Sequence, residues 1–160
     1  MITVGKKAPS FKLSNQNDDP VHLSSFGGQW VVLYFYPRDD TPGCTKEACE
    51  FTTGIRGLSK VDAVVLGCSP DTADSHRAFI KKHKLKVTLL SDPTHTVMEK
   101  YGAWGEKVLY GKRTIGVKRS TVIIDPAGKV AHHWRAVKVA GHADKVQEKV
   151  AELAERGAVD

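Results

Sequence analysis

The sequence predicts an α/β fold in which helices flank a mixed β-sheet. Apolar runs typical of buried strands alternate with amphipathic segments early in the chain, and two more strands follow late around the turn Asp125-Pro-Ala-Gly128. That order, β-α-β-α-β-(α)-β-β-α, indicates a mixed sheet covered by helices. At 160 residues the chain fits one domain, residues 1–160, long enough to bury a sizeable core.

The first elements lead up to a helix that carries two cysteines. A short N-terminal extension, with an extended lead-in over 4–13 and a brief edge strand over 21–23, precedes the buried strand over 30–36. Pro37 ends that strand, residues 39–41 supply helix-capping side chains, and Pro42 suits the first helical position. Offsets of three and four then predict the inward face of a helix that ends near Lys60: Cys44, Ala48, Phe51, Ile55 and Leu58.

The later elements follow from the same periodicities. Residues 61–69 are apolar enough for a central parallel strand, and 87–90 form another buried strand. Helices are expected from about Thr72 to His83, from about Thr94 over a short stretch, and from His142 to Glu155. Residues 104–118 lack a clear period, so we expect a loop with short extended pieces there. The late hairpin comprises 119–124 and 130–135.

Composition limits the class of protein. The chain is 41% hydrophobic and 26% charged, and no stretch approaches the ~20 apolar residues of a membrane span. Three cysteines do not make a disulfide scaffold, so we expect a reducing compartment, the cytoplasm. Much of the net charge of +6 lies in the run Lys81-Lys-His-Lys-Leu-Lys86, which has no aromatic residues for base stacking. The run is either a solvated helix end or a patch that steers an acidic protein partner; nucleic acid is not expected.

Cys44 falls in the first turn of the predicted helix. Unpaired backbone N–H groups and the positive end of the helix dipole favour a thiolate at that place. A stabilised thiolate is what a redox or nucleophilic cysteine requires. Cys68, in contrast, lies in an apolar strand and is expected to pack in the core.

Cys49 follows Cys44 by five positions in the same helix. Helix geometry places the two side chains about 140° apart, with Cα atoms roughly 8–9 Å apart. A disulfide needs Cα atoms within about 7 Å, so the pair cannot form one while the helix is intact. Cys49 is therefore either an inert core thiol or a partner that reaches Cys44 after the first turns unwind. Its place toward the outer side of the helix favours the second alternative.

The motif around Cys44 resembles the active site of the peroxiredoxins. Pro37-x-x-x-Thr41-x-x-Cys44 matches the peroxiredoxin pattern, and Thr-Pro-Gly-Cys-Thr-x-Glu-Ala-Cys49 is similar to the Q-type, or bacterioferritin comigratory protein, subgroup. The resemblance covers nearly the whole chain, including Gly5-x-x-Ala8-Pro9-x-Phe11, Ser91-Asp92 and Lys118-Arg-Ser-Thr121. It implies a thioredoxin-like fold and an atypical 2-Cys peroxidase.

The resemblance also implies a role for each site residue. Cys44 is the peroxidatic nucleophile, oxidised to a sulfenic acid. Thr41 hydrogen-bonds the thiolate and the peroxide, although a simple helix cap explains it equally. Pro37 shields the thiolate from water, or only ends its strand. Arg119 approaches the thiolate and polarises the O–O bond, and Glu47 orients Arg119; by sequence alone these two are an ordinary surface arginine and a helix-surface carboxylate.

The remaining implications concern turnover. Cys49 resolves the sulfenic acid as an intramolecular disulfide after local unwinding over roughly 43–51, and thioredoxin or a similar dithiol donor reopens it. Hydrogen peroxide and organic hydroperoxides are the expected substrates, and a monomer is expected. The cycle needs no cofactor, and the seven histidines show no metal spacing.

Two competing hypotheses remain. A disulfide oxidoreductase on the same fold needs Cys-x-x-Cys, which the Cys44–Cys49 spacing does not supply. A non-catalytic redox-sensing module would use the Cys44–Cys49 disulfide to alter a partner surface.

Overall fold

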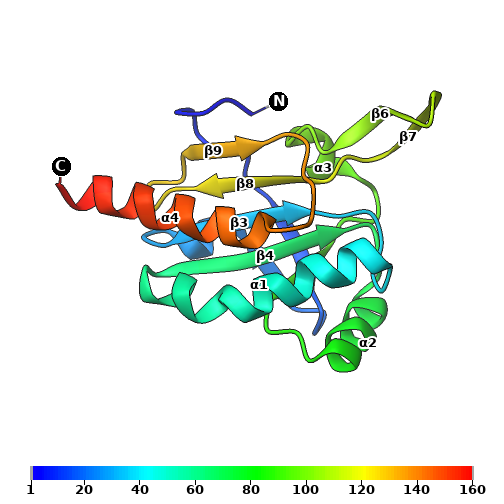
Figure 1. Ribbon diagram of the computed structural model, residues 1–160, viewed down its shortest axis with the longest axis horizontal. Coiled ribbons are helices and arrows are strands. Elements are labelled where there is room, and N and C mark those ends of the chain that lie inside the picture. Colours follow the sequence, from blue (N-terminus) through cyan, green and yellow to red (C-terminus); the bar gives the residue numbers. More distant parts are fainter. Residues whose placement is uncertain (1, 160) are drawn as a thin grey trace.

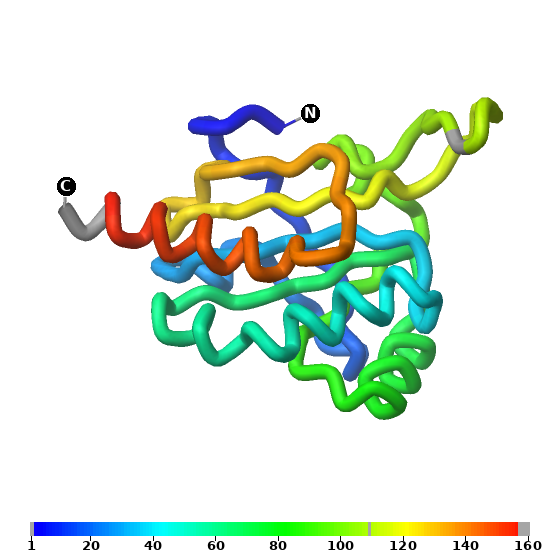
Figure 2. Tube along the Cα trace, viewed as in Figure 1, coloured from blue at the N-terminus to red at the C-terminus, as the bar shows by residue number. Residues whose placement is uncertain are grey.

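The computed structural model describes residues 2–159, apart from the side chains of Leu109 and of 157–159. A seven-stranded sheet with strand order β2-β1-β5-β4-β3-β8-β9 forms its centre, and β6 and β7 form a separate two-stranded ribbon that projects from the body (Figure 1). The path of the chain is easiest to follow in the tube of Figure 2. None of the helices within residues 2–159 combines the length and the apolar character that a membrane crossing requires.

The strands and helices have the following bounds. The strands are β1 (Lys12–Asn15), β2 (Pro20–His22), β3 (Trp30–Phe35), β4 (Ala63–Ser69), β5 (Thr88–Ser91), β6 (Trp104–Leu109), β7 (Lys112–Val117), β8 (Ser120–Ile124) and β9 (Val130–Trp134). The helices are the 3₁₀ turn η1 (Leu23–Phe26), α1 (Pro42–Lys60), α2 (Ala73–His83), α3 (Thr96–Lys100) and α4 (His142–Val159).

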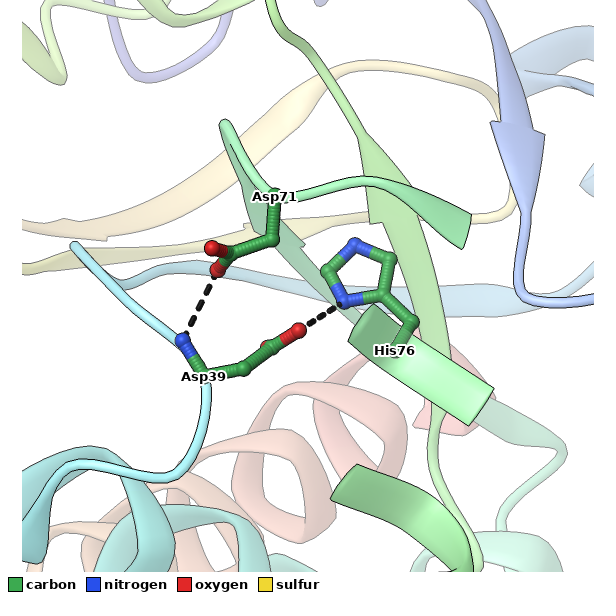
Figure 3. A group of neighbouring side chains, drawn as sticks. All are labelled: Asp39, Asp71 and His76. Atoms are coloured by element: carbon green, nitrogen blue, oxygen red, sulfur yellow. Dashed lines mark hydrogen bonds and ion pairs between the residues drawn. The ribbon is translucent and has the colours of Figure 1, made fainter. Parts of the chain in front are cut away.

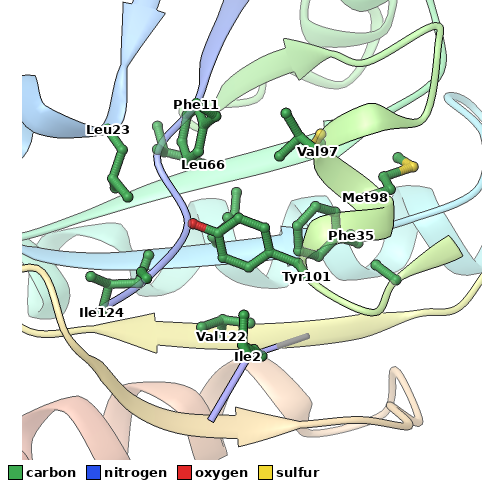
Figure 4. Close-up of a cluster of buried hydrophobic side chains, with 14 of the residues drawn as sticks. Ile2, Phe11, Leu23, Phe35, Leu66, Val97, Met98, Tyr101, Val122 and Ile124 are labelled. Atoms are coloured by element: carbon green, nitrogen blue, oxygen red, sulfur yellow. The ribbon is translucent and has the colours of Figure 1, made fainter. Parts of the chain in front are cut away.

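The three middle strands of the sheet are parallel, and antiparallel strands extend it on both sides. β3 pairs parallel with β4 and β4 with β5, whereas β8 lies antiparallel to β3. Side chains of β3 alternate between two apolar clusters, one on each face of the sheet. α1 and α4 run side by side over one face (Figure 1). The other face packs against α3 and the N-terminal segment through Phe35, Tyr101 and Phe11 (Figure 4).

The architecture confirms the predicted mixed sheet flanked by helices. The predicted helices and central strands all occur, with ends that differ by a few residues. The N-terminal extension contributes two strands, β1 and β2, at the edge of the sheet, and α4 continues to Val159 beyond the predicted end.

The prediction of a loop over 104–118 is wrong. These residues form the regular hairpin β6–β7, with Trp104 opposite Val117 and Leu109 opposite Lys112. Its turn residues Tyr110 and Gly111 both have positive φ, 52° and 77°, as a hairpin turn of type I′ requires. Much of the hairpin is exposed, so its side chains do not follow the alternation of apolar and polar residues from which strands are recognised.

Tyr34 of β3 and Tyr36, which directly follows the strand, belong to the same apolar cluster but differ in their hydrogen bonding. The Tyr34 ring stacks on Phe51 of α1 with 4.7 Å between ring centroids, and a Cβ at Gly67 would lie 2.7 Å from Tyr34 Cζ. The buried Tyr34 hydroxyl has no hydrogen-bond partner among the described residues. The Tyr36 hydroxyl instead donates to Asp39 Oδ1 at 2.5 Å.

This difference predicts opposite effects of one substitution at the two positions. Tyr34→Phe removes an unsatisfied buried hydroxyl and should raise the free energy of unfolding by about 1 kcal/mol, whereas Tyr36→Phe breaks a bond to a carboxylate and should lower it by about 2 kcal/mol. Urea unfolding at constant m-value measures both changes. Equal changes in the free energy of unfolding of the two variants would contradict the conclusion that the Tyr36 hydroxyl is hydrogen-bonded and the Tyr34 hydroxyl is not.

Candidate active site

The site lies where β3 ends and α1 begins, at the carboxyl edge of the parallel strands. Thr41 is the N-cap residue of α1 and Pro42 opens the helix, so Cys44 is the third helical residue. Its thiol is buried, with 1% of the residue exposed. The prediction that Cys44 occupies the first turn of a helix is confirmed.

Arg119 joins Cys44 to Glu47. One guanidinium nitrogen, Nη2, donates to Cys44 Sγ at 3.1 Å, and Nη1 donates to Glu47 Oε1 at 2.6 Å. Arg119 immediately precedes β8, and the pairing of Phe35 with Ser120 brings it to the end of β3. A hydrogen bond from a cation favours the thiolate over the thiol. The structure therefore brings together three of the residues that the resemblance implies, Cys44, Arg119 and Glu47.

Burial of Glu47 makes the charged form of its carboxyl group less favourable. Glu47 is 1% exposed, and loss of solvation raises the pKa of its carboxyl from 4.5 to about 7, although the Arg119 charge acts in the opposite direction. Its second oxygen, Oε2, has no partner among the described residues. Burial lowers the pKa of Arg119, but Glu47 and Cys44 raise it by more, so the net shift is upward. The guanidinium thus stays charged beside the thiol.

The segment between β3 and α1 differs from the expectation in two respects. The Thr41 hydroxyl donates to the Arg38 carbonyl oxygen at 3.0 Å, and the expected bond to Cys44 is not among those of the described residues. None of the side chains of residues 39–41 caps the helix, although Thr41 occupies the N-cap position. Asp39 is buried against α2, and Asp40 is bonded to Lys82 and His83 near the end of that helix.

An open hollow of about 360 Å³ lies beside Arg119. Pro37, which is exposed, forms part of its wall together with apolar side chains from β7 and from the segment after β9. Three further cations line it: Lys107, Lys118 and Arg135. Pro37 therefore stands at the approach to Arg119, and its role in limiting access of water stays a prediction.

All three cysteines are free thiols. Cys49 lies within the unbroken helix α1 and is half-buried, packing partly against the apolar cluster beneath α1 and α4. The expectation that it faces outward is thus only partly met. Cys68 is fully buried in β4, where burial raises the pKa of its thiol, in line with core packing.

A buried polar cluster beside the site was missed by the sequence analysis. Asp39, Asp71 and His76 place ligand atoms within 4.8 Å of one another (Figure 3), yet the atoms that face each other already take part in hydrogen bonds. In the helix predicted over 72–83, His76 stands at a helical offset from the apolar residues Ala73, Phe79 and Ile80, and a histidine buried among them needs a polar partner. The need of His76 for a polar partner was the available signal in the sequence. It could not identify that partner, because Asp39 lies 37 residues earlier in the chain.

Comparison with known proteins identifies the family. A model described as the AhpC/TSA family matches residues 4–133. The chain belongs to this family. Peroxiredoxin Bcp of Bacillus subtilis is 39% identical over 155 residues, which cover 97% of this chain and 99% of that protein. Peroxiredoxin Bcp of Escherichia coli is 41% identical over 145 residues, 91% and 93% of the two chains.

Solved structures agree with this assignment. The bacterioferritin comigratory protein of Xanthomonas campestris matches with a TM-score of 0.89 and 35% identity, over 95% of this chain and 99% of that chain. A reduced 2-Cys peroxiredoxin of Plasmodium vivax matches with a TM-score of 0.78 and 27% identity, over 97% and 98%. The resemblance to the peroxiredoxins and the thioredoxin-like fold are thereby confirmed. The chain is a peroxiredoxin, a thiol-dependent peroxidase.

The buried Glu47 predicts a pH dependence of stability. Because its folded pKa of about 7 exceeds the ordinary 4.5, the folded state keeps a proton that the unfolded chain releases between these values. The wild type should therefore lose stability relative to Glu47→Gln as the pH rises through this interval, and the difference should level off above it. Urea unfolding of both proteins at several pH values measures the effect. A difference that stays flat or runs the other way contradicts the raised pKa.

Proposed function

We propose that this peroxiredoxin reduces hydrogen peroxide and organic hydroperoxides through a cycle of Cys44 and Cys49. The observation that carries the proposal is the double hydrogen bond of Arg119 to Cys44 and to the buried Glu47. The Xanthomonas relative has alkyl peroxide reduction activity, which supports organic hydroperoxides as substrates.

The first step is an attack of the Cys44 thiolate on the outer peroxide oxygen. A bond forms between Sγ and that oxygen, the O–O bond breaks, and the departing alkoxide or hydroxide takes a proton from water to leave as alcohol or water. Arg119 donates to the thiolate and has a further role at the oxygens as negative charge develops on them. Glu47 holds the guanidinium in place through Nη1. Pro37 limits access of water, and the proposed role of Thr41 at the peroxide requires its hydroxyl to leave the Arg38 carbonyl.

The second step is resolution by Cys49. Its thiolate attacks the Cys44 sulfenic sulfur, an S–S bond forms, and hydroxide leaves and becomes water on protonation. In the intact helix the two Cα atoms are roughly 8–9 Å apart, beyond the reach of a disulfide. The first turns of α1 therefore unwind before this step. An external dithiol of the thioredoxin type then reduces the disulfide and returns both thiols.

Thiol counting tests the cycle. Wild type treated with an equivalent of peroxide should lose two thiols and two mass units, since one disulfide forms and two hydrogens leave. Cys49→Ser should stop at sulfenic acid or higher oxides. Intact mass and free-thiol titration give both results.

Cys68→Ala serves as the matched control and should behave like the wild type, because Cys68 is fully buried. An internal disulfide in Cys49→Ser would make Cys68 the resolving thiol and exclude the unwinding step. If neither the wild type nor Cys49→Ser reacts at low peroxide, Cys44 is not activated and the proposed cycle fails.

Arg119→Lys tests the double hydrogen bond. A single ammonium cannot span Cys44 and Glu47 as the guanidinium fork does, so the second-order rate constant with peroxide should fall by about 100-fold. Stopped-flow kinetics at fixed pH measures it. Arg113→Lys, which changes an arginine with 81% of its side chain exposed on the β6–β7 hairpin, should leave the constant within about twofold of the wild type. Equal rate constants for Arg119→Lys and the wild type would contradict the proposed role of the double hydrogen bond of Arg119 in the reaction with peroxide.

A further inference from the structure

Asp39 ties the segment before α1 to the body of the protein. Its carboxylate accepts hydrogen bonds from the Tyr36 hydroxyl at 2.5 Å and from the Ser75 hydroxyl at 2.8 Å, and Oδ2 lies 2.7 Å from His76 Nδ1. Its backbone N–H donates to Asp71 Oδ2 at 2.8 Å (Figure 3). Asp39 itself is 7% exposed. A chain segment with so many buried bonds has one preferred position.

The bond between Asp39 and His76 depends on a shared proton. His76 is fully buried, and its Nε2 lies 3.0 Å from the Leu90 carbonyl oxygen, which can only accept. Nε2 therefore carries a proton. Nδ1 faces a carboxylate oxygen, which is also an acceptor, so this contact is attractive only when a second proton lies between the two groups. The pair thus exists as imidazolium and carboxylate, or as imidazole and carboxylic acid, and in both forms it is neutral as a whole.

The partners of this segment all belong to elements other than α1. Ser75 and His76 lie on α2, Asp71 lies in the turn before α2, and Leu90 lies on β5. The neighbouring Asp40 adds two surface bonds to the same helix, at 2.7 Å to Lys82 and 2.8 Å to His83. The chain just ahead of Cys44 is therefore held by α2, while α1 itself packs against β4 and α4.

We propose that Asp39 and His76 are positioning residues for Cys44. They hold the segment 37–41 so that α1 begins at Pro42 with Cys44 beside Arg119, and they oppose the unwinding that lets Cys49 reach Cys44. The pair favours the reaction with peroxide and slows disulfide formation. The part that concerns Cys49 rests on the proposed two-cysteine cycle; the part that concerns the peroxide reaction does not.

Loss of the contact between Asp39 and His76 should have opposite effects on the reaction with peroxide and on disulfide formation. A displaced thiolate loses its alignment with Arg119, and a misplacement of about 1 Å can cost up to about 100-fold in rate. A helix start that is no longer anchored unwinds more readily, so the disulfide forms faster. Faster resolution leaves less time for a second peroxide to oxidise the sulfenic acid to sulfinic acid.

The test is Asp39→Ala, measured in two backgrounds. With Cys49→Ser, the second-order rate constant of Cys44 with hydrogen peroxide should fall by about tenfold. With Cys49 present, the first-order rate constant of disulfide formation should rise several-fold, and the fraction of sulfinic acid at high peroxide should fall by the same factor. Rapid quenching followed by intact-mass measurement separates the sulfenic acid, the disulfide and the sulfinic acid. Tyr36→Phe, which removes one bond to Asp39 without changing shape, should shift both constants in the same directions by less, and serves if Asp39→Ala does not fold.

Two variants serve as controls. Asp39→Asn keeps the shape and can donate to the neutral form of His76 while it accepts from Tyr36, so it should restore both rate constants to within about threefold of the wild type. Asp19→Ala makes the same chemical change on an exposed residue between β1 and β2, away from the segment 37–41, and should alter neither constant by more than about twofold.

The outcomes separate positioning from simple stability. A merely structural role lowers the amount of reactive protein and leaves both rate constants of the folded fraction unchanged, which overturns the proposal. It is also overturned if both constants fall together or if Asp39→Asn is as impaired as Asp39→Ala. If wild type forms no Cys44–Cys49 disulfide, the two-cysteine cycle fails, and positioning is then judged from the peroxide reaction of the Cys49→Ser proteins alone.

Discussion

The site depends on a single guanidinium held between a thiol and a buried carboxylate. The Arg119 side chain is only 19% exposed, so its charge acts on Cys44 and Glu47 through a medium less polar than water. The antiparallel pairing of β8 with β3 brings Arg119 to this place, because the residue before β8 comes to lie where β3 is followed by α1. A change in the order or register of these two strands would separate the arginine from the thiol.

Burial of Glu47 is the counterpart of this arrangement. A carboxylate removed from water is unfavourable unless it is paired, and Glu47 has one oxygen bonded to Arg119 and the other without a partner. The carboxyl is therefore only partly compensated, as its raised pKa records. Such a group contributes little to stability. In the proposed cycle its role is to fix the direction of the guanidinium fork, which it contacts from the second turn of α1, on the same side of the helix as Cys44.

The proposed cycle places two opposing demands on helix α1. Cys44 needs an intact first turn for its contact with Arg119, whereas a disulfide with Cys49 needs that turn to open. The structure divides the helix accordingly. Polar contacts to Arg119 and to α2 hold its start, while apolar packing holds it from Ala48 onward, including the stack of Phe51 on Tyr34. In the proposed cycle, contacts of different kinds at the two ends let the first turns open while the rest stays packed.

Local signals in the sequence determined much of this molecule. The apolar run of β3, Pro42 at the start of α1 and the turn between β8 and β9 set their elements because each depends on neighbours within a few residues. Cys44 follows from them, since its place in the first turn needs only the helix start. The family motif supplied Arg119 and Glu47, which no local pattern would have singled out. Only the tertiary structure decided the contacts of Asp39 with His76, the bond of Thr41 to Arg38 and the regular β6–β7 hairpin. The first joins residues 37 positions apart, which meet because β3, β4 and β5 end at one edge of the sheet. A pairing of that kind depends on strand order, which the sequence does not display in any one stretch.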